Sequence, residues 1–402
     1  MFRFIFLFIF AVTALSSIAN TKDDTLSTEN AQSFEAFLDD IRIKASAQGV
    51  SKATLDRAFI GLTPNPKVIK YDRNQAEFSL NFWRYINSRV SNNRLEKGKI
   101  KLKKNQTLLD IVYQQYGVPP SVLVAFWGLE TNYGKHVGKM NLVRSLATLS
   151  FDLRRRAFFT RELLILLKLI DEGKLPYDVE GSWAGAMGNT QFMPSNVAAY
   201  AIDADNNGEL DLWGSKVDIF HSSSNFLKRI GWHRGEKWGR EVIIPPDFDP
   251  ISATLKIKKP IKKWQEMGVR NAQGGHLPTS SLKASLILPM GFEGPAFLVY
   301  RNFHAILRWN RSLLYALSVG HLSDKLLNNQ TLVAKPITEP SLNRDDVIFI
   351  QTTLNDLGFD TGYPDGISGP KTRHATRQFQ QSAGLPVDGY VGYQLLQRLK
   401  TP

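Results

Sequence analysis

The residues Phe126-Trp127-Gly128-Leu129-Glu130-Thr131-Asn132-Tyr133-Gly134 place one carboxylate at the end of an apolar segment, between bulky side chains and a glycine. Pro119-Pro120-Ser121 opens this segment as a helix, and Gly134 is placed to end it. A glutamate held against Trp and Phe loses water, so its charged form is disfavoured and its pKa rises. Such a group stays protonated near neutral pH and can donate a proton to a glycosidic oxygen. The alternative is a solvated glutamate on a helix surface.

Composition and the N-terminus narrow the choice of partner. The 402 residues carry a formal net charge of +13, which favours nucleic acid, acidic lipid or acidic polysaccharide. A basic start, an apolar run over residues 4–15 and small residues at 16–20 predict a signal peptide at residues 1–19, with an uncleaved anchor as the alternative. The chain has no cysteine, so neither a disulfide nor a lipidated cysteine is available. We therefore expect an exported protein without a stable membrane anchor after cleavage, whose partner is acidic wall polymer and not nucleic acid.

Periodicity divides the rest of the chain. Residues 33–116 follow a helical pattern, and one long helix is predicted from about 143 to 172. Short β-like runs at 242–244, 253–257, 285–288 and 296–300 predict a small sheet inserted in a helical domain. Helical pattern resumes at 302, so the main domain is predicted at 33–327. The polar, proline-containing segment 328–341 is interpreted as a linker.

The last part of the chain, residues 342–400, is predicted to be a separate helical module. Asp365-Gly366-Ile367-Ser368-Gly369 and Asp388-Gly389-Tyr390-Val391-Gly392 are matching turns, each leading into a helix. This near-repeat favours a compact three-helix unit. A plain helical cap on the main domain is the alternative.

A Gly- and Ala-rich run follows Glu130 at residues 181–195. Small residues there let the backbone approach a ligand, and Ser182 and Gln191 offer hydrogen bonds, although tight helix packing would use the same residues. Together with Glu130, the segment 72–78, Arg155-Arg156-Ala157 and Arg308-Trp309-Asn310-Arg311-Ser312, this run resembles the lytic murein transglycosylases of the membrane-bound B type. The resemblance covers most of residues 34–322.

The resemblance implies a mainly α, lysozyme-like catalytic domain over residues 33–327 with the small β subdomain inserted, in a periplasmic enzyme of wall turnover. It implies that Glu130 is the single catalytic acid/base and that no cofactor is required. The polymer's MurNAc–GlcNAc bond would be cleaved without hydrolysis, leaving a 1,6-anhydroMurNAc end. The implied cleft residues are Ser182, Gln191, Asn310 and Tyr315, with Arg155 and Arg156 nearby. Trp309 stands where the family often has Tyr, so we expect it to stack but not to supply the hydrogen bond of a tyrosine hydroxyl; Phe226 likewise occupies a position that can be Tyr.

The C-terminal unit resembles the common three-helix peptidoglycan-binding domain. Asp365-Gly366-Ile367-Ser368-Gly369-Pro370-Lys371-Thr372 and Leu385-Pro386-Val387-Asp388-Gly389 carry the match. The implied role is to hold the enzyme on glycan strands and raise the local concentration of substrate.

An acidic loop follows the Gly-rich run. Asp203, Asp205 and Asn207 stand at positions one, three and five, with Gly208 at six, as in the start of a calcium loop. Position twelve is Gly214, so the usual closing glutamate is missing. The B-type family has a variant loop closed by a later Asp, here Asp218, which lies one residue beyond the family spacing. We expect a structural calcium site, with a hydrogen-bonded turn as the alternative. The candidate ligands are Asp203, Asp205, Asn207, Glu209 and Asp218.

Two other functions stay open at this point. A hydrolytic muramidase would need a second carboxylate brought close by folding, and Asp152 is one candidate. A wall-binding protein with an inert catalytic domain would share the two-part layout but would not need Glu130 together with Ser182, Gln191 and Asn310.

Overall fold

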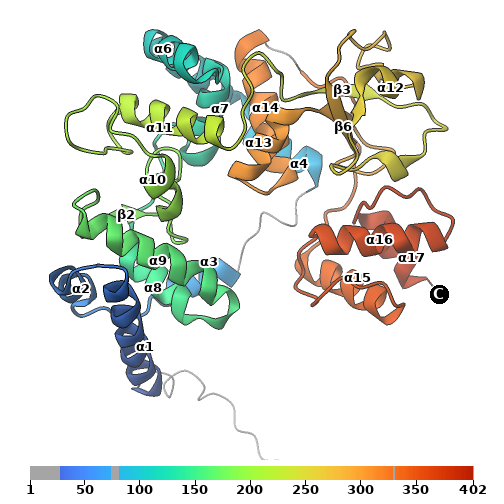
Figure 1. Ribbon diagram of the computed structural model, residues 1–402. Helices are drawn as coiled ribbons and strands as arrows, with labels where there is room; N and C mark the ends of the chain where they lie inside the picture. Colours follow the sequence, from blue (N-terminus) through green and yellow to red (C-terminus); the bar gives the residue numbers. More distant parts are fainter. Residues whose placement is uncertain (1–27, 74–80, 329–330, 402) are drawn as a thin grey trace, which may run out of the picture.

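The computed structural model describes residues 28–73, 81–328 and 331–401, and these are mainly helical, as predicted (Figure 1). The predicted signal peptide and residues 74–78 of the early motif lie outside the described residues. None of the helices described is long and apolar enough to cross a membrane. The helices up to the glutamate motif are α1 (Thr28–Ala47), α2 (Lys52–Phe59), α3 (Pro66–Arg73), α4 (Phe82–Arg89), α5 (Asn92–Lys104), α6 (Gln106–Tyr116) and α7 (Pro120–Thr131).

Two hydrophobic cores build the main domain. One lies among α4, α5, α6, α7, α11 (Lys216–Arg229), α13 (Arg301–Trp309) and α14 (Leu313–Asn328). The other lies among α1, α2, α3, α8 (Leu142–Phe151), α9 (Arg156–Asp171) and α10 (Pro194–Tyr200). Trp309 packs against both cores, so the end of α13 marks the junction between them.

Helix α7 is apolar on all sides because it runs through the first core. Each residue from Val122 to Trp127 is at most 5% exposed. Burying a side chain of this size contributes roughly 1.5–3 kcal/mol, so the position of α7 is strongly fixed. Its last turn, which carries Glu130, is therefore held by the core and not by surface contacts.

The single helix predicted at about 143–172 is two helices. Helix α8 ends at Phe151, a short 3-10 turn covers Leu153–Arg155, and α9 starts at Arg156. The break occurs at Asp152, whose backbone is extended and whose carboxylate accepts a hydrogen bond from the Arg154 N–H. An aspartate that caps the following turn competes with helix continuation.

The predicted β insertion is a five-stranded antiparallel sheet with strand order β4-β6-β7-β3-β5. A separate two-stranded pair, β1 (Met140–Asn141) with β2 (Glu180–Gly181), lies before it in the chain. The five strands are β3 (Gly239–Ile243), β4 (Lys259–Pro260), β5 (Arg270–Asn271), β6 (Lys283–Ile287) and β7 (Ala296–Val299), and α12 (Ile261–Glu266) packs on them.

The strand predicted at 253–257 is wrong. This segment follows a 3-10 turn at Pro250–Ser252, and the Thr254 hydroxyl accepts hydrogen bonds from the backbone N–H groups of Lys256 and Ile257. These amides are therefore committed to a local turn and do not pair with a neighbouring strand.

The C-terminal unit is the predicted three-helix module, formed by α15 (Arg344–Asp356), α16 (Pro370–Ser382) and α17 (Tyr393–Lys400). Its two Asp-Gly turns are held in the same way. Gln351 donates to Asp365 and accepts from the Gly366 N–H, and Gln380 does the same with Asp388 and Gly389. The glycines have φ of 76° and 70°, a conformation that disfavours any side chain.

The module packs against the sheet region (Figure 1). Arg377 donates to the Ala253 carbonyl at 2.9 Å, and Asp388 accepts from the Phe292 N–H at 2.9 Å. The preceding segment is also fastened, because the Glu241 carboxylate accepts from the N–H groups of Val333 and Ala334, both at 2.7 Å. Residues 331–341 therefore form a bonded strap, which is held first by the β subdomain at Glu241 and then by Asn81 and Arg84 at the start of α4.

Candidate active site

Glu130 stands in the last turn of α7, where the buried helix reaches the surface, and it is half-buried. The helix ends at Thr131, and not at Gly134 as predicted, because Asn132, Tyr133 and Gly134 are all left-handed, with φ of 51°, 63° and 85°. Such a turn costs energy at the two non-glycine residues. Packing maintains it: the Tyr133 ring fills the space beside Gly128, and its hydroxyl donates to the Arg94 carbonyl. Burial also raises the pKa of Tyr133, which keeps the hydroxyl a neutral donor.

Two donors converge on one oxygen of Glu130. The Tyr315 hydroxyl, from the first turn of α14, donates to Oε1 at 2.5 Å. The Trp309 indole N–H, from the last residue of α13, donates to the same Oε1 at 2.9 Å. The sequence led us to expect that Trp309 would stack without supplying the hydrogen bond of a family tyrosine. The ring does stack, and the structure adds a donor that sequence reasoning did not foresee, the indole nitrogen.

Aromatic rings pack around Trp309. The Trp309 ring stacks on Phe226 with centroids 4.7 Å apart, and Phe126 lies 4.6 Å away. Phe192, from the Gly-rich run, meets Trp309 edge-on at 5.4 Å. Tyr200 continues the stack behind Phe226 at 4.4 Å. The rings fix the plane of Trp309 and thereby the direction of its N–H.

The Gly-rich run is bonded to the residues that follow Glu130. Thr131 donates to the Asn189 carbonyl at 2.7 Å, and Trp127 donates to the Asn189 side-chain oxygen at 2.6 Å. The Asn189 amide donates in turn to the Trp213 carbonyl at 2.6 Å. Asn189 thus joins α7, the Gly-rich run and the acidic loop. Sequence reasoning missed this role.

Ser182 and Gln191 lie in the same run, and both are partly exposed. The Ser182 hydroxyl accepts from the Ala186 N–H at 3.0 Å and thereby holds a tight turn. Gln191 has a left-handed backbone, φ 53°, and its amide nitrogen donates to the carbonyls of Val137 and Gly188. With the nitrogen fixed by two acceptors, the Gln191 side-chain oxygen is the group left to accept from a ligand.

Asn310 follows Trp309 directly and ends α13. Its side-chain oxygen accepts from the Ser312 N–H at 3.0 Å, so its amide nitrogen is the group left for a ligand. The consecutive helices α13 and α14 therefore bring Trp309 and Tyr315 to Glu130 of α7, which is far from them in the sequence.

Arg155 and Arg156 lie at the break between α8 and α9. Arg155 pairs with the buried Asp72 of α3, and Arg156 donates to the carbonyls of Ser150 and Phe151. Asp152 lies in the same corner, where it pairs with Arg73 at 3.3 Å. Within the described part of the chain, none of these three side chains contacts Glu130.

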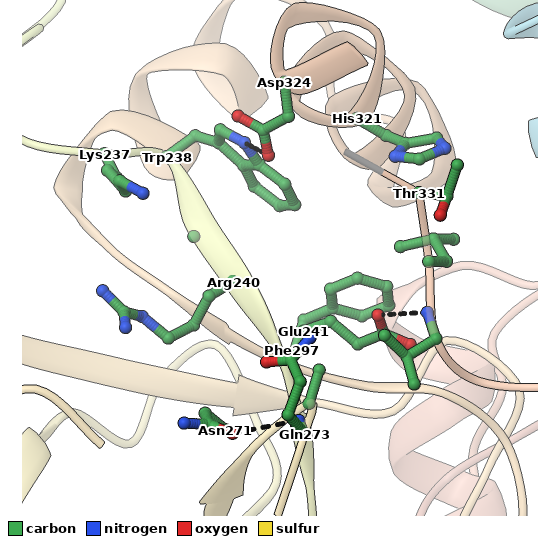
Figure 2. Close-up of a pocket in the computed structure, with 14 residues that line it drawn as sticks. Lys237, Trp238, Arg240, Glu241, Asn271, Gln273, Phe297, His321, Asp324 and Thr331 are labelled. Atoms are coloured by element: carbon green, nitrogen blue, oxygen red, sulfur yellow. Dashed lines mark hydrogen bonds between the residues drawn. The ribbon is translucent and has the colours of Figure 1, made fainter. Parts of the chain in front are cut away.

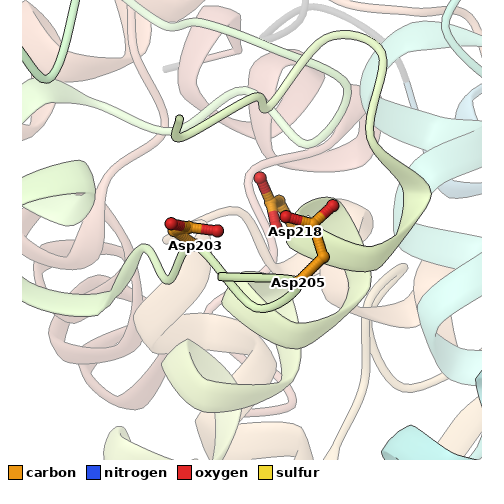
Figure 3. Close-up of side chains that lie close together, drawn as sticks. All are labelled: Asp203, Asp205 and Asp218. Atoms are coloured by element: carbon orange, nitrogen blue, oxygen red, sulfur yellow. The ribbon is translucent and has the colours of Figure 1, made fainter. Parts of the chain in front are cut away.

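The acidic loop brings three carboxylates together. Oxygens of Asp203, Asp205 and Asp218 lie within 4.8 Å of one another (Figure 3). Asp218 is fully buried at the start of α11, where its two oxygens accept from the N–H groups of Ala204 and Asp211. The one-residue shift of Asp218 along the sequence therefore does not remove it from the cluster. The Asn207 backbone N–H donates to the Asp203 carboxylate. Glu209 is exposed and is not part of the cluster.

The fold and the site indicate one class of protein, and comparisons with known proteins agree on that class. The chain belongs to the transglycosylase SLT domain family, which it matches over residues 33–324, and residues 343–399 match a peptidoglycan binding domain. The family is that of the lytic transglycosylases, lyases that act on peptidoglycan, and the lysozyme-like fold predicted from the sequence is confirmed.

Particular relatives can be named. The chain is similar to SltB3 from Pseudomonas aeruginosa, solved in complex with NAG-anhNAM-pentapeptide, with 44% identity and a TM-score of 0.85 over 92% of this chain and 99% of that one. It is 34% identical to the membrane-bound lytic murein transglycosylase B of Escherichia coli over 60% of this chain, and spans 65% of that protein's length. The lytic transglycosylase Slt35 of Escherichia coli, solved in complex with calcium, is 29% identical with a TM-score of 0.62, over 75% of this chain and 94% of that one.

Proposed function

We propose that this chain cleaves the β-1,4 bond between MurNAc and GlcNAc in peptidoglycan without hydrolysis, leaving a 1,6-anhydroMurNAc end, for wall remodelling and turnover. The observation that carries the proposal is the carboxylate of Glu130, which is held by two donors on one oxygen at the junction of the two cores. The relative SltB3 was solved with a ligand that contains an anhydro sugar.

Glu130 acts first as the acid. Because Tyr315 and Trp309 both donate to Oε1, Oε2 carries the transferable proton. Oε2 gives this proton to the glycosidic oxygen, and the bond from that oxygen to C1 of the MurNAc sugar breaks. The two donors then stabilise the carboxylate that is left, since hydrogen bonds to an ionised group are the stronger ones.

Glu130 then acts as the base. Its carboxylate removes the proton of the C6 hydroxyl on the same MurNAc, and that oxygen bonds to C1. The proton returns to Glu130, so the enzyme is regenerated and water is not consumed. An internal hydroxyl is held close to C1 by the sugar itself, which replaces the water that a second carboxylate would otherwise activate.

The remaining cleft residues position the sugars in this proposal. The Gln191 oxygen would accept a hydrogen bond from the glycan, and the Asn310 amide nitrogen would donate one to it. Ser182 holds the tight turn at the start of the Gly-rich run. Arg155 and Arg156 would meet acidic groups of the substrate further along the glycan strand. Arg155 pairs with Asp72 and Arg156 bonds the end of α8, so both are held at the break between α8 and α9.

A hydrolytic muramidase is supported less well. The candidate second carboxylate, Asp152, is used as a turn cap and as the partner of Arg73. A water-activating carboxylate has to face the scissile bond together with the acid. An inert wall-binding protein would have no use for the converging donors on Glu130.

We also propose a periplasmic location after removal of residues 1–19, with glycan strands as the partner of both parts of the chain. The module of α15–α17 would hold the strand near the cleft. Calcium, if bound, would be held by Asp203, Asp205 and Asp218 with Asn207 beside them, because oxygen donors in a flexible loop suit this ion. It would fasten the loop that Asn189 joins to α7, and it takes no part in proton transfer.

The test is Glu130→Gln on purified sacculi. The amide keeps the shape of the side chain but cannot cycle a proton, so lysis should fall to background while circular dichroism and the melting temperature stay close to wild type. Glu96→Gln, on the exposed face of α5, is the matched control and should lyse sacculi normally. Substantial turnover by a folded Glu130→Gln protein would rule out the assignment.

A further inference from the structure

A pocket lies between β3, β5, the second half of α14 and the strap that follows α14 (Figure 2). It encloses about 120 Å³, which is below the range of drug-sized ligand sites and suits one small group, such as the end of a chain. Helix α14 separates it from the site described above: Tyr315 in the first turn contacts Glu130, whereas His321 and Asp324 line this pocket. The proposed reaction uses none of its residues.

His321 is the first sign of a ligand. The side chain is only 9% exposed, and within the described ranges no hydrogen bond or ion pair involves its ring. Burial lowers the pKa of His321 to about 4, so the imidazole is neutral at physiological pH and offers one donor and one acceptor. The ring nitrogens have no partner among the described residues, so the imidazole can bond a group that enters the pocket (Figure 2).

Two cations lie together at the opposite edge (Figure 2). Among the described residues, Lys237 forms no ion pair or hydrogen bond. Arg240 uses its Nε to donate to the Tyr300 hydroxyl at 2.7 Å, and its other N–H groups have no acceptor among the same residues. Lys237 is exposed and Arg240 is half-buried, so both can exchange water for the oxygen atoms of an anionic group.

Among the described residues, the two acids of the pocket form no ion pair with these cations within 4 Å, although Lys237 lies close enough to Asp324 to oppose the rise of its pKa. Both oxygens of Glu241 accept from the strap amides of Val333 and Ala334. Asp324 accepts from the Trp238 indole at 3.0 Å, and its burial raises its pKa to about 6. With Lys237, Arg240, Glu241 and Asp324 all ionised, the formal charges cancel. One negative charge at the cationic edge is therefore favoured, and a dianion such as phosphate is not.

The chemistry also argues against a sugar. Trp238 is 6% exposed and its N–H is committed to Asp324, so no aromatic face is available for a sugar ring to stack on. What remains is a carboxylate beside Lys237 and Arg240, with an adjacent N–H group directed at Asp324 or His321. This is the end of a peptide chain.

We propose that this pocket binds the terminal carboxylate of a short peptide, of the kind carried as stems by peptidoglycan. The identity of the peptide rests on the proposed function. A stem held here would anchor the strand through a contact that Glu130 does not provide, on the strap that leads to the C-terminal module.

The experiment uses the full chain and the free stem pentapeptide, with no sugar attached. The indole N–H of Trp238 is followed by NMR and assigned by its loss in Trp238→Phe. We expect a saturable shift of this signal. The same peptide with a C-terminal amide should bind at least about tenfold more weakly, because a charge-assisted hydrogen bond is lost. Lys237→Ala and Arg240→Gln should weaken binding similarly, whereas the exposed Lys262→Ala, outside the pocket, should not.

Three results would overturn the assignment of this pocket. Equal binding of the amidated peptide, or an equal effect of inorganic phosphate or acetate, would overturn the assignment to a peptide carboxylate, as would no shift of the Trp238 signal. Lysis of sacculi by the same preparation is measured separately. Lysis without peptide binding would refute the peptide site and leave the proposed function intact. Peptide binding without lysis would support the peptide site and refute the proposed function.

Discussion

The pair of donors on Glu130 Oε1 can be tested by removing each in turn. Tyr315→Phe removes the hydroxyl, and Trp309→Phe removes the indole N–H while keeping a ring against Phe226 and Phe126. A hydrogen bond to a charged group contributes about 1.5–3 kcal/mol. If this is lost in the transition state, kcat should fall about 10- to 150-fold for either variant.

The double variant adds information because both donors share one oxygen. When one is removed, the other can shorten or a water can replace it, so the two losses should not add. Removing donors also disfavours the carboxylate form, so the alkaline limb of the kcat/KM profile should move to higher pH. The assay is the release of soluble fragments from sacculi. Tyr116→Phe, a tyrosine on α6 away from Glu130, is the control. If Tyr315→Phe retained kcat within about twofold, like the control, the structure-based role of this donor would be refuted.

Three other outcomes are expected. Burial raises the pKa of Asp324 from 3.8 to about 6, so the folded state binds this proton more tightly and stability falls as pH rises through this window. In urea unfolding, Asp324→Asn should therefore be more stable than wild type by up to about 3 kcal/mol at pH 8 and not at pH 3.5. Equal stability of the two proteins at both pH values would contradict this prediction. Millimolar calcium should raise the melting temperature of wild type but not of Asp203→Ala, and magnesium should be much less effective. If calcium does not change the melting temperature, the loop is only a hydrogen-bonded turn. Deletion after Ser341 should weaken binding to sacculi and leave turnover of short soluble fragments nearly unchanged, because the module bonds to Ala253 and Phe292 of the β subdomain. An equal loss on both substrates would show that the module completes the catalytic fold.

The sequence predicts what depends on local pattern. The apolar run before Glu130 gives α7, and the repeated Asp-Gly turns give the C-terminal module, where one glutamine bonds each turn. The positions of Tyr315 and Asn310 in the site came from the family resemblance, and the structure adds the contact between Tyr315 and Glu130.

What the sequence cannot predict depends on how elements cross. The Trp309 indole reaches Glu130 only because the end of α13 meets the end of α7, and periodicity carries no such information. The break at Asp152 and the turn at Thr254 come from side chains that bond the backbone and override a helical or β-like pattern. The pocket at Trp238 joins a strand, a helix and the strap, so no single segment signals it.

The central claim is that one carboxylate cleaves the glycan without water. Purified sacculi should be digested by the full chain in water labelled with heavy oxygen, and the fragments analysed by mass spectrometry. The account predicts muropeptides that end in 1,6-anhydroMurNAc, one water lighter than hydrolytic products and free of the label. Reducing ends that carry the label would contradict it and identify a hydrolase.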